Sequence, residues 1–365
     1  MASNKNQHYV PQCYLRQFSA SDTGSSINLF NIDSGKFIQG APIKNQCSKN
    51  YFYGDDLVLE KAFQPIEGQY STVVKQIKSP GYKLVDEDRE FLKSFWLLQY
   101  LRTEAASKRD IELTEGMNEA IGDDAYLYRL KLKEAVQESV RRFPKIIGTL
   151  SDLKVCLLYN KTALDFITSD DPAVLTNRWY LQDARTRGMS FGLGSAGNIL
   201  LLPLTDKIMM LGYDGHIYNI PHKNGWLNAT SPADIKAINE HQLLNCRANI
   251  FVRNPDLAVQ IADLFDVVKT NKPKFRHKIN YLIFDGIEEN GDQRFKAANK
   301  EQFQQHEHSL MHCQVVNIIP NMWPSVFTWR LKGIAYFKNS GAGYIRQAMA
   351  LKEPHYAEFK KVKIR

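Results

Sequence analysis

The sequence predicts an α+β fold, in which a helical portion packs against a mixed β-sheet and an α/β extension follows toward the C-terminus. Residues 56–148 carry apolar side chains at three- and four-residue steps, which is the spacing of amphipathic helices. Residues 153–220 instead hold short apolar runs of strand length, separated by turn-forming residues. Because helices and strands fall in successive blocks rather than in regular alternation, the order of elements favours the α+β class.

The N-terminal region is predicted to form a β-hairpin followed by a helix. Two β-prone runs, residues 27–32 and 36–39, flank an Asp-Ser-Gly turn and predict the hairpin. A helix is expected over residues 56–78, with Asp55 or Asp56 as its cap. Pro65 lies inside this pattern and is expected to kink the helix or to mark a break.

A second helix is predicted over residues 86–108, where Phe91, Phe95 and Leu98 form an apolar stripe. Residues 110–147 predict one long helix or two shorter ones, interrupted near Gly122. The block that follows is predicted to hold strands at 153–160, 163–169, 198–204 and 207–213, an Asp-Gly hairpin turn into 217–220, and a helix over 231–246.

The last third is predicted to alternate between helices and strands, which divides the chain into a core of residues 1–255 and a basic extension of residues 256–365. The predicted elements of the extension are helices near 254–268 and 296–310, strands at 281–284, 313–319 and 325–337, and a short terminal helix.

Composition places the chain among globular proteins, with 44% hydrophobic and 24% charged residues. No apolar run approaches the roughly 18 residues that span a bilayer, and the N-terminus lacks the apolar core of a signal peptide. Five scattered cysteines form no Cys-x-x-Cys pair, which argues against a disulfide framework and a zinc site. We therefore expect a cytoplasmic protein with reduced thiols.

The net charge of +8 is concentrated in the extension, because residues 251–365 sum to +7 and residues 1–250 to +1. The densest run, KTNKPKFRHK, contains Lys272, Lys274, Arg276 and Lys278 with an interleaved phenylalanine. Such a pattern is typical of a nucleic-acid contact surface, although a solvated basic loop has the same composition. We name these four residues as candidate nucleic-acid contacts.

Three polar side chains of the N-terminal region are candidates for chemistry. His8, beside a proline-fixed backbone, has the nitrogen of a general base or metal ligand. Arg102 continues the apolar stripe of the second helix, so its guanidinium is expected to be buried and to need a partner such as Glu67, Asp170 or a bound anion. Either a structural ion pair or a phosphate clamp satisfies that need.

Asp170 and Asp171 follow a predicted strand in the turn FITSDDP. Adjacent carboxylates at a strand end suit Mg²⁺ or Mn²⁺, which prefer oxygen ligands. The alternative is an Asx-type turn that Pro172 holds in place.

Two further motifs are weak. The Gly192–Gly197 stretch fits G-x-G-x-x-G but precedes a strand instead of a helix, so no nucleotide cofactor is expected. His308 and His312 are spaced for chelation from one helical turn, although we favour a solvated helix end as the explanation.

The fragments HYVPQCYLRQF, NYFYGDDLVLEKAFQPIEGQY, LLQYLRTEAA, FITSDDPAV and LLPLTDK occur in that order between residues 7 and 255. This ordered series resembles a large bacterial family known as domain of unknown function 4238. The resemblance implies that certain residues occupy the characteristic positions of the family, namely His8, Pro11, Gln12, Glu60, Glu67, Gln99, Arg102, Ser169, Asp170 and Pro172.

Two functions fit these observations. In the first, the protein is a metal-dependent nuclease or phosphodiesterase acting as a toxic effector in anti-phage defence, with a possible partner protein of the same system. His8, Gln12, Glu67, Arg102 and Asp170 are then catalytic, and Glu67 and Asp170 hold Mg²⁺ or Mn²⁺. In the second, the polar set is a structural network, and the protein is a non-catalytic module that binds nucleic acid or a partner protein.

Overall fold

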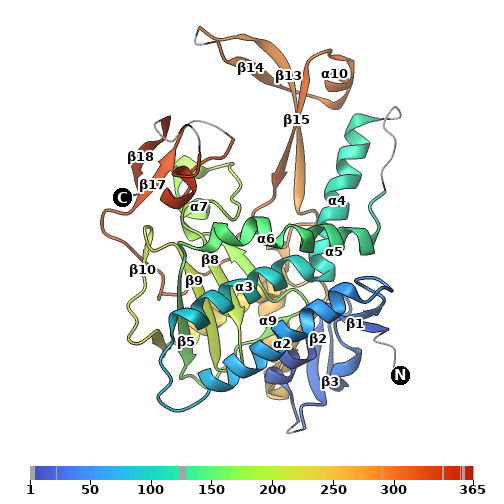
Figure 1. The fold of residues 1–365 in the computed structure, drawn as a ribbon, viewed down its shortest axis with the longest axis vertical. Helices are drawn as coiled ribbons and strands as arrows, with labels where there is room; N and C mark the ends of the chain where they lie inside the picture. The colour runs from blue at the N-terminus through green and yellow to red at the C-terminus, as the bar shows by residue number, and fades with distance from the viewer. Residues whose placement is uncertain are drawn as a thin grey trace.

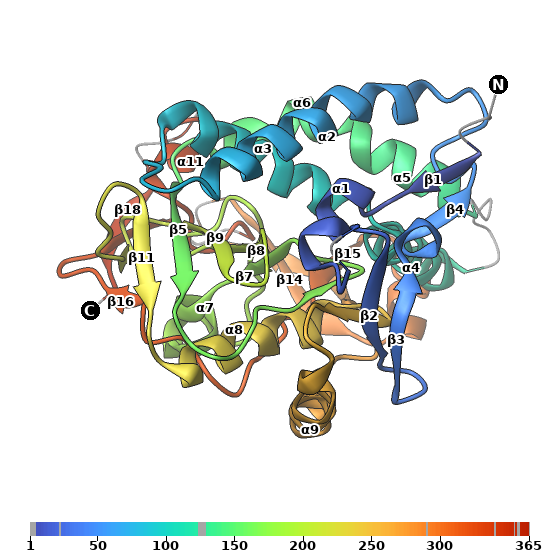
Figure 2. The ribbon, with the colours of Figure 1, turned by 90° about the horizontal axis from the view of Figure 1, so that it is seen from below.

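A five-stranded mixed sheet lies at the centre of the chain, between a layer of helices on one face and a single long helix on the other (Figure 2). The computed structural model describes residues 5–21, 23–122, 129–289, 291–338, 341–353, 355 and 358–364. In spatial order the strands of this sheet are β11 (Trp226–Ala229), β5 (Lys154–Asn160), β9 (Ile208–Tyr213), β8 (Ile199–Pro203) and β7 (Val174–Thr176). β11 runs parallel to β5, whereas the other neighbours are antiparallel. The α+β fold predicted from the sequence is confirmed.

The two faces of this sheet carry different hydrophobic clusters because side chains alternate along each strand. Val155 and Leu157 of β5 pack with α2 (Val58–Ile77) and α3 (Asp86–Arg102). Cys156 and Leu158 belong to the cluster on the opposite face, which is covered by α8 (Pro232–Asn245). α2 continues as one helix through Pro65. The predicted cap is wrong, because the N-cap residue is Leu57 and not Asp55 or Asp56, although the Asp56 carboxylate accepts the Val58 N–H at 3.1 Å.

The sequence predicts one helix over residues 86–108, and this is wrong in one respect. The structure has two helices there, which meet at Thr103. The Thr103 backbone is extended, and its side chain accepts the Ala106 N–H as the N-cap of α4 (Glu104–Ile121). α4 ends at Gly122, whose φ of +87° stops a helix, so the interruption predicted there is confirmed. α5 (Leu132–Arg141) and α6 (Phe143–Ile146) follow beyond residues 123–128.

A second, four-stranded sheet has the order β3-β2-β12-β6 and packs against α9 (Ala258–Val268). Its strands are β3 (Lys36–Pro42), β2 (Ser26–Asn31), β12 (Asn249–Val252) and β6 (Thr168–Ser169). The predicted β2–β3 hairpin is confirmed, whereas only two residues of the strand expected at 163–169 pair in a sheet. The N-terminal segment adds β1 (Asn6–His8), which pairs with β4 (Ser48–Asn50), and the short helix α1 (Gln12–Leu15).

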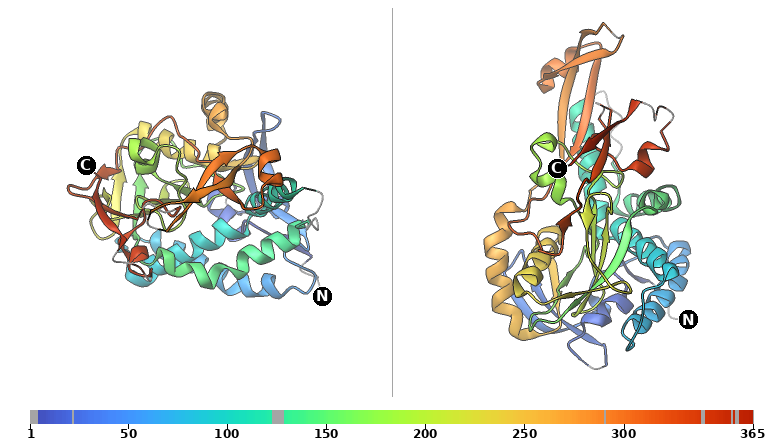
Figure 3. Two further views of the ribbon diagram at one scale, coloured as in Figure 1. Left: turned by 90° about the horizontal axis from the view of Figure 1, so that it is seen from above. Right: turned by 90° about the vertical axis from the view of Figure 1, so that its left-hand side faces the viewer.

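A three-stranded antiparallel sheet projects from this body beside α4 (Figures 1 and 3). We call it the β arm: β13 (His277–Ile287), β14 (Gln293–Ala298) and β15 (Ser309–Val315), with α10 (Lys300–Gln305) between β14 and β15. The helix predicted at 296–310 is therefore wrong except at α10, since pairing with β13 draws both flanks into strands. His308 and His312 consequently do not share a helical turn.

The rest of the extension packs back onto the core. Phe327, Ala335 and Ile364 complete the cluster below the central sheet. This part of the extension contains β16 (Thr328–Trp329), β17 (Ile334–Phe337), β18 (Lys360–Lys363) and the short helix α11 (Gln347–Ala350). β16 pairs with the core strand β10 (Tyr218–Asn219), and β17 pairs with β18. The core also contains the short helix α7 (Arg178–Gln182). The Asp214-Gly215 turn therefore does not join a hairpin, because β10 pairs with β16 and not with β9. Among the described residues, no helix is both long enough and apolar enough to cross a bilayer.

Candidate functional site

The buried guanidinium of Arg102 joins three segments of the N-terminal region. Its Nη2 donates to Glu67 Oε1 and to the backbone oxygen of His8, each at 2.8 Å, and its Nε donates to the Tyr53 hydroxyl at 2.9 Å. Only 1% of the Arg102 side chain is exposed, so each of these bonds compensates for lost hydration. The predicted partner Glu67 is therefore found. A fourth contact is the Phe63 ring, whose centre lies 4.4 Å from the guanidinium carbon.

The His8 imidazole lies close enough to this ion pair to interact with both charges, but its own hydrogen bond is to another residue, and the Gln12 side chain bonds to Arg16. The His8 Nε2 is 3.2 Å from the Lys44 backbone oxygen, and burial lowers the pKa of the imidazole despite the nearby Glu67 carboxylate. Gln12 Oε1 accepts a hydrogen bond from Arg16 at 3.2 Å. The structure thus brings His8, Glu67 and Arg102 together at the N-terminal segment.

Asp170 is held by backbone groups of the segment that follows α8. Its carboxylate accepts the N–H groups of Arg247, Ala248 and Asn249 at 2.8, 2.9 and 3.1 Å. Burial raises the pKa of this carboxyl to about 6, and the three N–H donors oppose that rise. The neighbouring Ser169 hydroxyl donates to Gln242 on α8 at 2.8 Å. These contacts fix the FITSDDP turn against α8.

The two predicted metal ligands have different neighbours. Glu67 contacts Arg102, whereas both oxygens of Asp170 accept backbone N–H groups. Within the described part of the chain, no group of three or more His, Cys, Asp or Glu side chains could hold a metal ion. The arrangement of Glu67 and Asp170 in this structure does not fit a shared Mg²⁺ or Mn²⁺, and we derive no step through such an ion.

A second buried ion pair, between Arg109 and Asp171, lies near the N-terminal end of α4. Arg109 Nη1 is 2.5 Å from Asp171 Oδ2, and the Asp171 side chain is fully buried. The Thr103 hydroxyl donates to Asp171 Oδ1 at 2.7 Å, and Asn245 Nδ2 lies 3.1 Å from Oδ2. Asp171 therefore ties the α3–α4 junction to the end of α8 and orients the Arg109 guanidinium.

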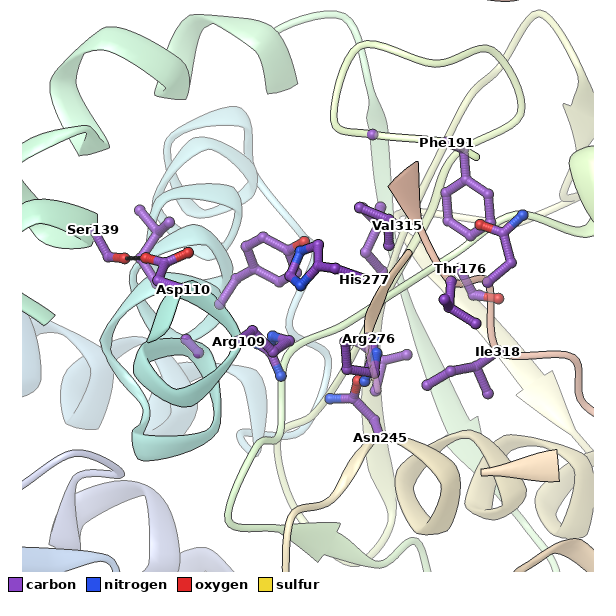
Figure 4. A pocket seen from close by; sticks show the side chains of 18 of the residues that line it. Arg109, Asp110, Ser139, Thr176, Phe191, Asn245, Arg276, His277, Val315 and Ile318 are labelled. Carbon is purple, nitrogen blue, oxygen red and sulfur yellow. Dashed lines mark hydrogen bonds between the residues drawn. The ribbon is translucent and has the colours of Figure 1, made fainter. Parts of the chain in front are cut away.

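Arg109 lines a cavity of about 240 Å³ between α4, α5, β7, the end of α8 and the base of the β arm (Figure 4). We call it the arm-base hollow. Figure 4 shows Arg109, Asn245 and Arg276 gathered at one side of it, with His277 beside them and Phe191 on the opposite side. Family-core residues and extension residues therefore build the hollow together.

Several buried polar atoms around the arm-base hollow lack a hydrogen-bond partner within the described structure. They are Arg276 Nε, His277 Nδ1, His241 Nε2 and Asn317 Oδ1. Burial, reinforced by the Arg109 charge, lowers the pKa of Arg276 to about 10. Burial also lowers the pKa of His277, and that of His241 to about 4. Unpaired buried donors and acceptors are costly, which makes their concentration around one cavity notable.

A second, more open hollow shares Arg109, Asn245 and Arg276 with the first. We call it the outer groove. Its charged lining consists of six cationic side chains and one carboxylate: Lys108, Arg109, Arg247, Lys272, Lys274, Arg276 and Glu112. A concave surface of this kind attracts anions.

The outer groove contains three of the four basic residues predicted to contact nucleic acid. Lys274 is exposed, with its ammonium 5.3 Å from the Phe275 ring centre. Lys272 donates to the Leu244 and Cys246 carbonyls at the C-terminal end of α8, so part of its role is structural. Arg276 projects into both hollows, whereas Lys278 lines a separate hollow on the other side of the arm base.

Arg109, His241, His277 and Asn317 were not among the residues predicted from the sequence. No local signal marks Arg109, because it lies beyond the predicted helix end at residue 108 and, in the structure, on α4 and not on the helix that carries Arg102. His241, His277 and Asn317 carry no local signal either. Their meeting depends on contacts between distant parts of the chain.

The fold and its hollows define an α+β protein with a cationic cavity between a helical layer and a projecting β arm. The model of the family described as "Protein of unknown function (DUF4238)" matches residues 6–256, and the chain belongs to this family. The β arm lies beyond the matched range. Comparison with curated proteins and with solved structures finds no match.

Proposed function

We propose that this protein binds single-stranded nucleic acid, with the phosphate backbone lying in the outer groove. The observation that carries the proposal is the excess of six cationic side chains over one carboxylate in a single concave surface. Phosphate contacts by Lys and Arg supply most of the sequence-independent affinity for nucleic acids. This proposal corresponds to the binding-module hypothesis drawn from the sequence.

Two features favour a single strand over a duplex. Phe275 is 56% exposed beside Lys274, so a base can stack on it while the ammonium meets a phosphate. The groove also lies in the angle between α4 and the arm base and adjoins the arm-base hollow, a shape that a flexible strand follows more easily than a rigid helix.

Salt dependence of binding tests the proposal. We expect a fluorescein-labelled 12-nucleotide single strand to bind with an affinity that falls as salt rises, by a slope of about −0.7 for each phosphate contacted. Lys274→Ala together with Arg247→Ala is expected to weaken binding and to flatten the slope by about 1.4. Lys360→Ala, a basic residue on β18 outside the groove, is the matched control.

Lys278→Ala tests whether binding depends on the outer groove or on the whole basic run KTNKPKFRHK. Since Lys278 lines another hollow, its replacement is expected to leave the slope unchanged. Absence of binding at low salt, or equal loss in the groove variant and the Lys360→Ala control, would contradict the proposal.

Nuclease or phosphodiesterase activity, as the toxic effector of an anti-phage defence system with its own partner protein, stays a second prediction. One observation favours it: the half-buried His8 imidazole lies close enough to the 29% exposed Glu67 carboxylate for the two charges to interact. An imidazole beside a carboxylate and a guanidinium can act as a base toward water near a phosphate.

Its test is cleavage of RNA and DNA in Mg²⁺ or Mn²⁺ with EDTA controls, together with cell viability on induced expression. His8→Ala and Gln12→Ala are expected to abolish cleavage and toxicity while remaining folded. Wild type that neither cleaves nor harms the cell would remove this prediction and leave the binding proposal intact.

A further inference from the structure

We propose that the arm-base hollow binds one nucleotide unit, with its phosphate at Arg109 and Arg276 and its base in the apolar part of the cavity. This inference rests on the proposed function and names the part of the ligand that the hollow receives. The unit is either a free nucleotide or the terminal nucleotide of a strand that lies in the outer groove.

The distribution of charge in the arm-base hollow indicates where the phosphate of the ligand binds. Arg109 and Arg276 lie together at the side where the hollow meets the outer groove, and Arg142 is a third cation on the lining (Figure 4). Asp171 neutralises much of the Arg109 charge, whereas Arg276 Nε has no partner within the described structure and its neighbour Arg109 repels it. An anion between the two guanidinium groups would pair Arg276 and offset that repulsion.

The apolar lining places the base. Phe191 forms the side of the hollow opposite the arginines, and Val174, Val315 and Ile318 continue the apolar wall. Tyr100 adds a second aromatic ring to the lining. A planar aromatic base fits such a wall by stacking and by burial of its faces.

Unpaired polar atoms supply partners for the edge of the base. Asn317, which lines the cavity, donates from Nδ2 to the Met189 carbonyl at 2.8 Å, which fixes the amide and leaves Oδ1 as an unpaired acceptor in the described structure. Only 3% of the His241 surface is exposed, and its Nε2 likewise has no hydrogen-bond partner in the described structure. Binding sites place a few such groups among apolar walls to orient their ligand.

Size restricts the occupant. A cavity of about 240 Å³ lies below the range typical for drug-sized ligands, so it holds at most one nucleotide unit and excludes a duplex. Because Arg109, Asn245 and Arg276 line both hollows, a strand on the outer groove can continue into the cavity without leaving its cationic lining.

Isothermal titration of the full chain with defined probes tests the inference. The probes are the four 5′-ribonucleoside monophosphates, adenosine, inorganic phosphate, and a 10-nucleotide single strand with a 5′-phosphate, a 3′-phosphate or neither. We expect at least one monophosphate, or one of the phosphorylated strands, to bind about tenfold or more tightly than inorganic phosphate or adenosine.

Two pairs of variants separate the hollow from the groove. Phe191→Ala and Asn317→Leu alter the hollow and leave the lining of the outer groove unchanged. Each is expected to lower the affinity for the nucleotide probe by about tenfold while leaving the salt slope for the unphosphorylated strand unchanged. Lys274→Ala and Lys108→Ala alter only the groove. They are expected to flatten the salt slope for the unphosphorylated strand and to leave the affinity for the nucleotide probe unchanged. Phe191→Leu replaces Phe191→Ala if the latter does not fold, because it keeps most of the buried volume.

Each outcome has one meaning. Tight binding of a free monophosphate identifies a free nucleotide as the ligand, whereas dependence on Phe191 seen only with a phosphorylated strand identifies its terminal unit. Monophosphates that bind no better than inorganic phosphate, together with strand affinities that Phe191→Ala and Asn317→Leu leave unchanged, overturn the inference even if the groove binds the strand. Nucleotide binding without any strand binding supports the hollow and rejects the proposed function.

Discussion

The Glu112 carboxylate accepts the backbone N–H of Arg276 at 2.7 Å, and this hydrogen bond joins helix α4 to the base of the β arm. The same oxygen accepts the N–H of His277 at 3.0 Å. Glu112 lies inside the range matched by the family model, whereas Arg276 and His277 lie outside it. The extension is thus held at the point where it completes the arm-base hollow.

Loss of this anchor should affect both stability and binding. Glu112→Ala leaves two partly buried N–H groups without an acceptor, so we expect the free energy of unfolding to fall by about 1–3 kcal/mol. Nucleotide and strand binding are expected to weaken as well, because Arg276 is no longer fixed. Glu112→Gln keeps an accepting oxygen and should retain the stability. Urea denaturation and titration of both variants check this, and equal behaviour of the two would show that the hydrogen bonds have no such role.

The Arg102–Glu67 pair should be essential to the fold. Arg102→Met removes the donor to Glu67, Tyr53 and the His8 carbonyl at once, and breaking a buried pair costs about 3–5 kcal/mol. Arg102→Lys is also expected to destabilise, since one ammonium cannot replace two separate nitrogen donors. Arg141→Met, which breaks the exposed Arg141–Glu138 pair, is the control and should change the unfolding midpoint little. Guanidinium denaturation gives the comparison.

Replacement of Gln99 should stabilise the protein. Its side chain is fully buried on α3, and neither its amide nitrogen nor its amide oxygen has a partner in the described structure. Gln99→Leu removes these unsatisfied groups at similar volume and should raise the free energy of unfolding by about 1 kcal/mol. Thermal and urea denaturation measure it. A destabilised Gln99→Leu variant would indicate that the amide binds a water molecule or a ligand that stabilises the native state.

Local signals explain which elements the sequence could predict. The β2–β3 hairpin follows from its Asp-Ser-Gly turn, where Gly35 has a φ of +66°, and α8 follows from Pro232 in its first turn. The break at Thr103 could not be predicted, because it depends on the hydrogen bond from its hydroxyl to Asp171, 68 positions away. The predicted helix at 296–310 is wrong over the last three residues of β14, because the sequence KAA becomes part of a strand only through its pairing with β13.

The same distinction applies to the candidate site. Arg102 could be paired with Glu67 because each lies on or beside the apolar stripe of a helix that the sequence predicts. The arm-base hollow could not be foreseen, since Arg109 and Arg276 belong to segments far apart in sequence. Their approach is fixed by Glu112 at one contact and by Asp171 at another.

His241 should make the stability of the protein depend on pH. Burial lowers the pKa of its imidazole from about 6.5 in the unfolded chain to about 4 in the fold. Between these values the unfolded chain binds a proton that the folded chain does not, so the free energy of unfolding falls as the pH is lowered from 6.5 to 4. The contribution approaches about 3 kcal/mol at the lower pH.

His241→Gln removes this contribution, so its free energy of unfolding should decline less steeply between pH 6.5 and 4 than that of the wild type. His8 and His277, whose pKa values are also lowered by burial, contribute the same sign in both proteins and therefore cancel in the difference. His355→Gln, at an exposed histidine, controls for the loss of one imidazole. Urea denaturation at half-unit pH steps gives the slopes, and identical slopes for wild type and His241→Gln would show that the pKa of His241 is the same in the folded and the unfolded chain.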